Sequence, residues 1–271
     1  MAQSGILYVC ATPLGHLDDA SPRLLETLRT VVLICAEDTR HSQKLLARFE
    51  IHTPMTAVQE HTSPAKIAAL VNKLLDGDNL ALVTDAGTPG VSDPGPALVR
   101  AALEKGVTVS PIPGPCALAA ALSVSGFDAQ RFSFLGFLPR KPGKLRKTVA
   151  LALARGETLV IYESPYRVVK LVSAIAELAP EVPLVVCREL TKRFEEILRG
   201  PAREIAAELA GRSEQRGEFT LVVGNAGPLA PREDLEEDER DSPDFDLSDA
   251  ARFDPEVRGD DHHYQGDDER N

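Results

Sequence analysis

Short apolar runs and amphipathic stretches alternate along the first half of the chain. Short runs rich in Val, Ile and Leu predict buried strands at 6–11, 31–36, 79–85 and 107–114. Apolar residues spaced three and four apart predict helices at 21–30, 39–50, 63–77, 96–106 and 116–126. Ser21 with Pro22 suits the start of a helix, and Gly77 suits the end of one.

The alternation continues in the second half. Strands are predicted at 131–139, 158–164, 182–190, 194–200 and 217–225, and helices at 143–156, 165–179 and 201–211. Strands that alternate with helices favour an α/β fold with mostly parallel sheets, covered by helices on both faces. Two units are favoured over one very large sheet, so the sequence predicts α/β domains at 1–126 and 127–227.

The composition changes after Asn225. Residues 232–271 hold 17 acidic and 5 basic residues, which leaves 24 of the 41 acidic and 25 of the 30 basic residues in the chain before Arg232. The net charge of −11 therefore belongs to the tail, and the body is nearly neutral. The tail, 228–271, has few apolar residues and many like charges, which predicts a disordered segment.

Cysteine usage and hydropathy favour a cytoplasmic protein. The four cysteines show no CxxC spacing, which is typical of reduced thiols. No apolar run reaches the roughly 18–20 residues that span a bilayer. The first apolar run follows no charged residue, unlike the core of a signal peptide. We therefore expect a cytoplasmic location and no membrane contact.

Three loops rich in Gly and Pro each follow a predicted strand, at 11–19, 85–95 and 111–117. Because ligands of open α/β sheets bind at the carboxyl ends of strands, we expect these loops to share one ligand. Asp85 can accept hydrogen bonds from an amine or a ribose hydroxyl, and Thr88 and Ser92 offer donors. The alternative is that the loops are only tight turns.

The loops do not match a phosphate-binding motif. GxxxxGKS/T is absent, and GxGxxG does not follow the first strand. A ligand with an adenosine or amino-acid part fits better than a nucleoside triphosphate. No metal is expected, because His262 and His263 have no further ligands nearby at metal spacing.

The order and spacing of eight segments resemble one known family. ATPLGHLDD, AEDTRHSQKLL, VTDAGTPGVSDPG, PIPGPCA, FLGFLP, YESPYR, RELTKRFEEILRG and GEFTLVV follow one another between residues 5 and 225. They are similar to the ribosomal small-subunit RNA 2′-O-methyltransferase I family, a branch of the tetrapyrrole-methylase-like enzymes. VTDAGTPGVSDPG and RELTKRFEE carry the resemblance most strongly.

The resemblance implies a homodimer of two-domain chains with S-adenosylmethionine in the inter-domain cleft. The implied reaction transfers the sulfonium methyl group to a ribose 2′-oxygen of a cytidine in the decoding region of 16S ribosomal RNA, in the 30S subunit. The implied cofactor contacts are Pro13, Asp85, Ala86, Gly87, Thr88, Pro89, Val91, Ser92, Cys116, Ala117, Tyr162, Leu190 and Gly217.

Three residues depart from the family pattern. His16 stands in place of Asn, Cys116 in place of Ser, and Tyr166 in place of a frequent His. Cys116 keeps the size of Ser and weakens one hydrogen bond. His16 and Tyr166 leave the cofactor site intact but speak against a catalytic role at those two positions.

Methyl transfer from a sulfonium is an in-line displacement, so much of the catalysis can come from orienting the 2′-oxygen. A base that accepts the hydroxyl proton would help. The motifs hold four candidates, Asp38, Glu163, Glu189 and Lys192, and no sequence feature chooses among them. Asp38 is alternatively a helix N-cap, and Glu189 with Lys192 a surface ion pair.

A cluster of positive charge follows the predicted strand 131–139. Its members are Arg140, Lys141, Lys144, Arg146 and Lys147. We expect the cluster to bind RNA phosphates from a mobile loop that contains Pro142 and Gly143; the alternative is a solvated helix start. Arg40 and Arg167 either contact RNA phosphates or pair with nearby carboxylates.

Three functions remain open from the sequence. The first is an RNA 2′-O-methyltransferase, and the second is a methyltransferase of the same fold that acts on a small molecule such as a tetrapyrrole precursor. The third is a non-catalytic module that binds RNA or the ribosome. The basic cluster favours the first over the second, because a small-molecule pocket does not need it. The cofactor loops speak against the third.

Overall fold

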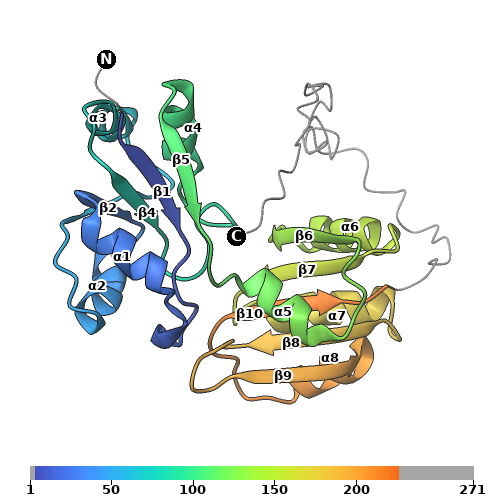
Figure 1. The fold of residues 1–271 in the computed structure, drawn as a ribbon. Helices are drawn as coiled ribbons and strands as arrows, with labels where there is room; N and C mark the ends of the chain where they lie inside the picture. Colours follow the sequence, from blue (N-terminus) through green and yellow to red (C-terminus); the bar gives the residue numbers. More distant parts are fainter. Residues whose placement is uncertain (1–3, 226–271) are drawn as a thin grey trace, which may run out of the picture. The chain divides into compact units, whose positions relative to one another are not determined.

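The computed structural model describes residues 4–225 (Figure 1). These residues form two five-stranded sheets with helices packed on them. The α/β fold is therefore confirmed. The predicted tail, 228–271, lies outside the described residues, and so do His262 and His263.

The first sheet is parallel throughout and has the order β3-β2-β4-β1-β5. Its strands are β1 (Ile6–Cys10), β2 (Leu33–Ala36), β3 (Met55–Ala57), β4 (Leu80–Val83) and β5 (Thr108–Ile112). Four of them were predicted. Strand β3 was not, because its 3 residues are too few to show a period.

Helices cover both faces of the first sheet. They are α1 (Pro22–Thr30), α2 (Thr39–Arg48), α3 (Pro64–Leu75) and α4 (Pro96–Glu104), with a short 3-10 helix, η1 (Leu17–Asp19). Alternate residues of a strand point to opposite faces: Leu80 and Leu82 belong to the core under α3 and α4, whereas Ala81 and Val83 belong to the core under α1 and α2. Both faces of β4 are therefore buried, which explains why all four of its residues are apolar.

The predicted start of α1 and the predicted end of α3 are confirmed. Ser21 Oγ accepts a hydrogen bond from the Leu24 N–H at 3.1 Å, and Pro22 occupies the first turn of α1. Gly77 follows α3 with a φ of 101°, which is the left-handed region that glycine tolerates.

The second sheet has the order β6-β7-β10-β8-β9 and is mixed. Its strands are β6 (Phe132–Phe137), β7 (Thr158–Glu163), β8 (Pro183–Arg188), β9 (Glu196–Pro201) and β10 (Phe219–Val223). Only β6 and β7 are parallel, while β10 is antiparallel to both of its neighbours and β9 is antiparallel to β8. The connection from β8 to β9 is too short for a parallel crossover, which explains the antiparallel pairing that was not predicted.

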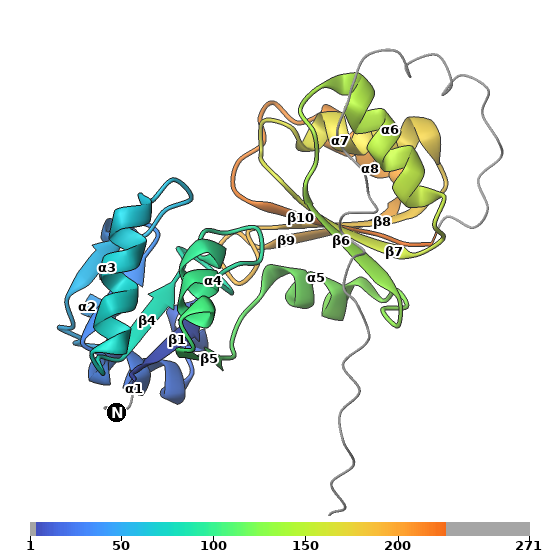
Figure 2. The ribbon, with the colours of Figure 1, turned by 90° about the horizontal axis from the view of Figure 1, so that it is seen from above.

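The two faces of the second sheet are covered differently. Helices α6 (Pro142–Leu153), α7 (Val168–Leu178) and α8 (Ala202–Ala210) share one core, and α5 (Ala117–Ser125) is the one helix of residues 4–225 that packs on the other face (Figure 2). Ala121 of α5 lies against Val160 and Val185. Helix α5 thus precedes the predicted boundary at residue 126 yet packs on the second sheet, and the boundary stays a prediction.

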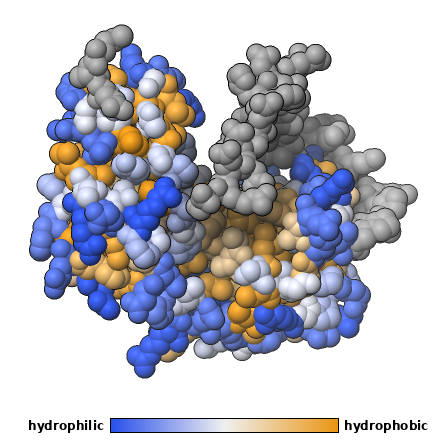
Figure 3. Space-filling view, in the orientation of Figure 1, coloured by the Kyte–Doolittle hydropathy of each residue, from blue (hydrophilic) through white to orange (hydrophobic). Residues whose placement is uncertain are grey.

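Polar and apolar residues are interspersed on the face that Figure 3 presents. Several large hydrophobic side chains are exposed, and four of them are aromatic: Phe132, Phe137, Tyr166 and Phe194. Within residues 4–225, none of the helices combines the length and the apolar character that a membrane span needs.

Candidate functional site

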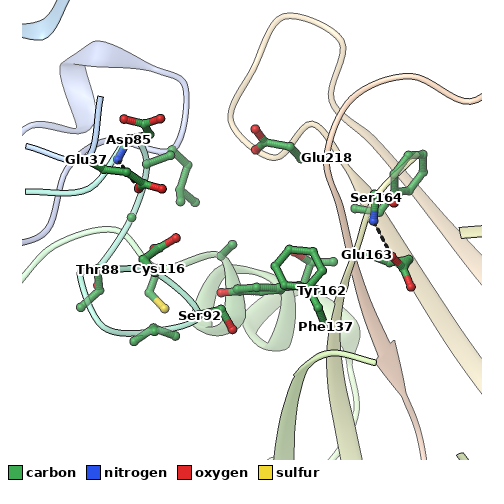
Figure 4. Close-up of a pocket in the computed structure, with 18 of the residues that line it drawn as sticks. Glu37, Asp85, Thr88, Ser92, Cys116, Phe137, Tyr162, Glu163, Ser164 and Glu218 are labelled. Atoms are coloured by element: carbon green, nitrogen blue, oxygen red, sulfur yellow. Dashed lines mark hydrogen bonds between the residues drawn. The ribbon is translucent and has the colours of Figure 1, made fainter. Parts of the chain in front are cut away.

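A pocket of about 330 Å³ lies at the carboxyl ends of the first sheet (Figure 4). One wall consists of residues that follow β1, β2, β4 and β5, and we call it the loop wall. The other consists of residues at the ends of β6, β7 and β10, and we call it the strand wall. This is the place where ligands bind in open α/β sheets.

Most of the predicted cofactor residues meet in this pocket. Nine of them line it: Asp85, Ala86, Gly87, Thr88, Val91, Ser92, Cys116, Ala117 and Tyr162. Pro13, Pro89, Leu190 and Gly217 do not line it, although Pro13 precedes Leu14 and Gly217 precedes Glu218, which do. Leu190 packs with α5 and the second sheet. The role of all these residues as cofactor contacts stays a prediction.

Hydrogen bonds join the loops of the loop wall to one another. Thr12 and Gly87 exchange both backbone hydrogen bonds, at 2.8 and 3.1 Å. Thr88 Oγ1 donates to the Pro115 carbonyl at 3.1 Å. Gly87 has a φ of 88°, which a side chain would disfavour. The loops after β1, β4 and β5 therefore form one connected surface.

Carboxylates gather on the loop wall. Glu37 Oε2 accepts hydrogen bonds from Thr84 Oγ1 at 2.7 Å and from the Asp85 N–H at 3.4 Å. Asp85 Oδ1 in turn accepts from the Asp38 N–H at 3.1 Å. Burial raises the pKa of Asp85, and the charge of Glu37 raises it further. Figure 4 shows the side chains of Glu37 and Asp85 next to each other.

Asp93 of the loop wall and Glu218 of the strand wall complete this acidic group. Burial raises the pKa of Asp93 to about 6, and the nearby charges of Glu37, Asp85 and Glu218 add to the shift. Glu37, Asp93 and Glu218 line the pocket but were not predicted. Asp93 lies inside the loop 85–95, so its position there was a usable signal, whereas Glu218 lies at the start of the predicted strand 217–225 and gave none.

The strand wall is aromatic. Tyr162 packs edge-on against Phe134, with ring centroids 4.8 Å apart, and against Phe137 at 6.0 Å. The Tyr162 hydroxyl accepts a hydrogen bond from the Leu118 N–H at 3.0 Å, and burial raises the pKa of this phenol. Ser92 meets this wall at Gly136, where a Cβ atom would come within 2.9 Å of Ser92 Oγ.

Two of the four candidate bases have structural partners near the pocket. Glu163 is buried and lines the pocket, with Oε1 accepting from the Ser164 N–H at 2.7 Å and Oε2 lying 3.1 Å from the Arg167 guanidinium. Asp38 is the N-cap of α2, which was the alternative to a catalytic role. The hydrogen bond from the Arg40 side chain lowers the pKa of Asp38 to about 2. A carboxylate with so low a pKa is a weak base.

The other two candidates form the ion pair that the alternative predicted. Lys192 Nζ lies 3.0 Å from Glu189 Oε1 and 3.1 Å from Glu218 Oε2. Burial lowers the pKa of Lys192, but the two carboxylates outweigh it and leave the pKa raised, so the amine stays protonated. Burial by itself raises the pKa of Glu189. Hydrogen bonds from the Glu218 N–H and from Lys192 outweigh burial and leave this pKa lowered. A catalytic role for any of the four stays a prediction.

The basic cluster is exposed, but the predicted mobile loop at Pro142 and Gly143 is wrong. Helix α6 begins at Pro142, so Pro142 and Gly143 belong to its first turn and not to a loop. Arg146 pairs with Glu177 at 2.7 Å. Within residues 4–225, no carboxylate pairs with the other four members of the cluster, Arg140, Lys141, Lys144 and Lys147.

The remaining predicted residues lie outside the pocket. Arg40 and Arg167 pair with Asp38 and Glu163, and contact of these arginines with RNA stays a prediction. His16 and Tyr166 are exposed and do not line the pocket. No group of side chains with the composition of a metal site occurs in the described part of the chain.

Comparisons with known proteins give consistent matches. Residues 7–206 match the family described as Tetrapyrrole (Corrin/Porphyrin) Methylases. A protein of Xylella fastidiosa named Ribosomal RNA small subunit methyltransferase I is 45% identical over 228 residues, which cover 83% of this chain and 84% of that protein. A Synechocystis protein of the same name is 46% identical over 226 residues, which cover 83% and 80%.

A solved structure shares the fold. Uroporphyrin-III C-methyl transferase from Thermus thermophilus, complexed with S-adenyl homocysteine, matches with a TM-score of 0.58 at 19% identity. The match covers 82% of this chain and 98% of that chain.

Proposed function

Because this chain belongs to the ribosomal RNA small subunit methyltransferase I family, within the tetrapyrrole methylases, we propose that it methylates a ribose 2′-oxygen of a cytidine in the decoding region of 16S ribosomal RNA, with S-adenosylmethionine as the donor. One observation carries the proposal. Nine residues that the family resemblance implies as cofactor contacts line a single pocket at the carboxyl ends of the first sheet. The names of the relatives supply the small-subunit RNA, and the resemblance of the motifs supplies the cytidine 2′-oxygen.

The charge of the pocket suits this donor. S-adenosylmethionine carries a sulfonium and an ammonium group, and Glu37, Asp85, Asp93 and Glu218 all line the pocket. Opposite charges attract strongly where water is partly excluded. The Thermus thermophilus protein of the same fold was solved with S-adenyl homocysteine, the form that the donor takes after losing its methyl group.

The reaction requires that the hydroxyl proton leave as the O–C bond forms. The oxygen attacks the methyl carbon, the S–C bond breaks, and its electron pair neutralises the sulfonium. Asp93 is our candidate acceptor for the proton, because it lines the pocket and its pKa of about 6 lies close to neutrality. Holding the oxygen in line with the methyl group supplies the rest of the catalysis.

The proposal includes the predicted partners. The exposed basic cluster around the start of α6 would bind RNA phosphates. A homodimer and a cytoplasmic location follow from the resemblance and from the ribosomal substrate.

The test is methyl transfer from labelled S-adenosylmethionine to 30S subunits that lack the modification. A 2′-O-methyl group protects the neighbouring phosphodiester from alkali, so the labelled position can be located as an alkali-resistant dinucleotide. We expect one labelled cytidine in 16S RNA. Label on a base, or on a tetrapyrrole precursor instead of RNA, would overturn the proposal.

A further inference from the structure

Phe137 is an exposed aromatic residue on the strand wall of the pocket. The residue is 58% exposed although it lines the pocket and packs edge-on against Tyr162. Figure 4 shows the two rings beside each other, away from Glu37 and Asp85. A large apolar ring left open to water at a binding site has a surface free to contact a ligand.

A β-bulge places this ring on the pocket side of β6. Phe134 pairs with Val160 and Phe137 with Tyr162, so one extra residue lies between the two pairs on β6. Without the bulge, Phe134 and Phe137 would point to opposite faces, because side chains alternate along a strand. With it, both rings contact Tyr162.

Gly136 makes the bulge possible. Its φ is 56°, and a Cβ atom there would meet Ser92 Oγ at 2.9 Å. The glycine therefore permits both the positive φ and the close approach of the loop wall.

The chain that follows Phe137 is held in place. Arg167 donates hydrogen bonds to the carbonyls of Leu138 and Pro139, at 2.7 and 3.2 Å. The same guanidinium is paired with buried Glu163, which also lines the pocket. Arg167 thus restrains the backbone next to the exposed ring.

Positive charge follows within a few residues. Arg140 and Lys141 are exposed and begin three and four positions after Phe137, which places their Cα atoms within about 14 Å of it by chain length. Lys144 and Lys147 continue the charge along α6. None of these four has a carboxylate partner among the described residues.

We infer that Phe137 is a stacking platform for a base of single-stranded RNA at the mouth of the pocket, with Arg140 and Lys141 on the flanking phosphates. An aromatic ring accepts the flat face of any base, and cations hold the backbone beside it. This inference rests on the proposed function in one respect, namely that the substrate is RNA.

Three variants test the inference. Phe137→Ala removes the ring, Phe137→Trp keeps an aromatic face, and Phe132→Ala removes an exposed ring from the same strand that does not line the pocket. One measurement is the affinity for a short single-stranded RNA that carries a fluorescent base analogue quenched by stacking. The others are kcat/KM on 30S subunits, the S-adenosylmethionine affinity by calorimetry, and the mass in solution.

We expect Phe137→Ala to lower the RNA affinity and kcat/KM about 5- to 150-fold, in line with the loss of one stacked base. Phe137→Trp should keep most of both, Phe132→Ala should keep wild-type values, and the cofactor affinity should not change. An unchanged RNA affinity in Phe137→Ala would overturn the inference. So would a parallel loss of cofactor affinity, which would assign the ring to the cofactor, or a fall in mass, which would assign it to a second copy.

The two proposals can fail separately. The wild-type protein could methylate no RNA while the Phe137→Ala variant binds RNA more weakly than the wild type. In that case the proposed function is wrong and the stacking platform stands. If it methylates 30S subunits equally well with and without the ring, only the stacking platform is wrong.

Discussion

The two walls of the pocket are built in different ways and carry different chemistry. The loop wall consists of turns after parallel strands, and it presents Glu37, Asp85 and Asp93. The strand wall consists of residues at strand ends, and it presents the rings of Phe137 and Tyr162 beside the carboxylates of Glu163 and Glu218. A cationic donor suits the first wall and a flat base suits the second. The difference suggests that the loop wall holds most of the cofactor, with Tyr162 and Glu218 beside it, and that Phe137 holds the RNA.

The largest effect is expected at Asp93. Asp93→Asn keeps the shape and removes the proton acceptor, so kcat should fall about 10²- to 10⁴-fold. In the wild-type protein, kcat/KM should rise with pH through about 6, because Asp93 must lose its proton before it can accept another. Asp18→Asn, an exposed change outside the pocket, is the control. A variant with the wild-type rate would remove Asp93 from the chemistry.

The next effect is expected at Asp85. Asp85→Ala removes a carboxylate fixed by the Asp38 N–H and should lower the S-adenosylmethionine affinity about 10- to 150-fold, the cost of a charged hydrogen bond. RNA affinity should not change. Asp76→Ala, exposed and just before the opposite end of β4, is the matched control. Equal calorimetric affinities in a folded Asp85→Ala protein would contradict the role of the loop wall.

A smaller effect is expected from reversing charge on α6. Lys144→Glu with Lys147→Glu should weaken single-stranded RNA binding about tenfold and flatten its log–log salt slope by about 1.4, since each lost phosphate contact contributes about 0.7. Acidic residues near a helix start favour the dipole, so folding should be kept. Arg100→Glu with Lys105→Glu, two exposed cations of the α4 region, is the control. The same salt slope in both double variants would show that the phosphates bind elsewhere.

The smallest effect concerns stability where the two walls meet. A Cβ atom at Gly106 would meet no atom within 4 Å, so Gly106→Ala only places an alanine in the left-handed region of φ. This should lower the free energy of unfolding by about 1 kcal/mol. Gly136→Ala adds the contact with Ser92 and should cost about 1 kcal/mol more. In a Ser92→Gly background this excess should disappear. Denaturant titration of the wild type, the three single variants and the Ser92→Gly/Gly136→Ala double variant measures it. An excess that persists without Ser92 would mean that the walls do not meet there.

The sequence predicted the loop wall far better than the strand wall. Gly and Pro in the loop 85–95 are visible in one sequence because they are local requirements of the backbone. Phe137 and Glu218 lie at the ends of apolar runs that read as core, and the bulge before Phe137 depends on the partner strand β7. The position of β10 in the middle of the second sheet is a long-range pairing, which no local pattern encodes.

The separation of the two walls is tested most directly by measuring both ligands on two variants. S-adenosylmethionine and single-stranded RNA are each titrated into Asp85→Ala and Phe137→Ala. The account predicts that Asp85→Ala loses affinity only for the cofactor, and that Phe137→Ala loses affinity only for RNA. Loss of the same ligand in both variants would contradict it, because the two walls would then form a single binding site.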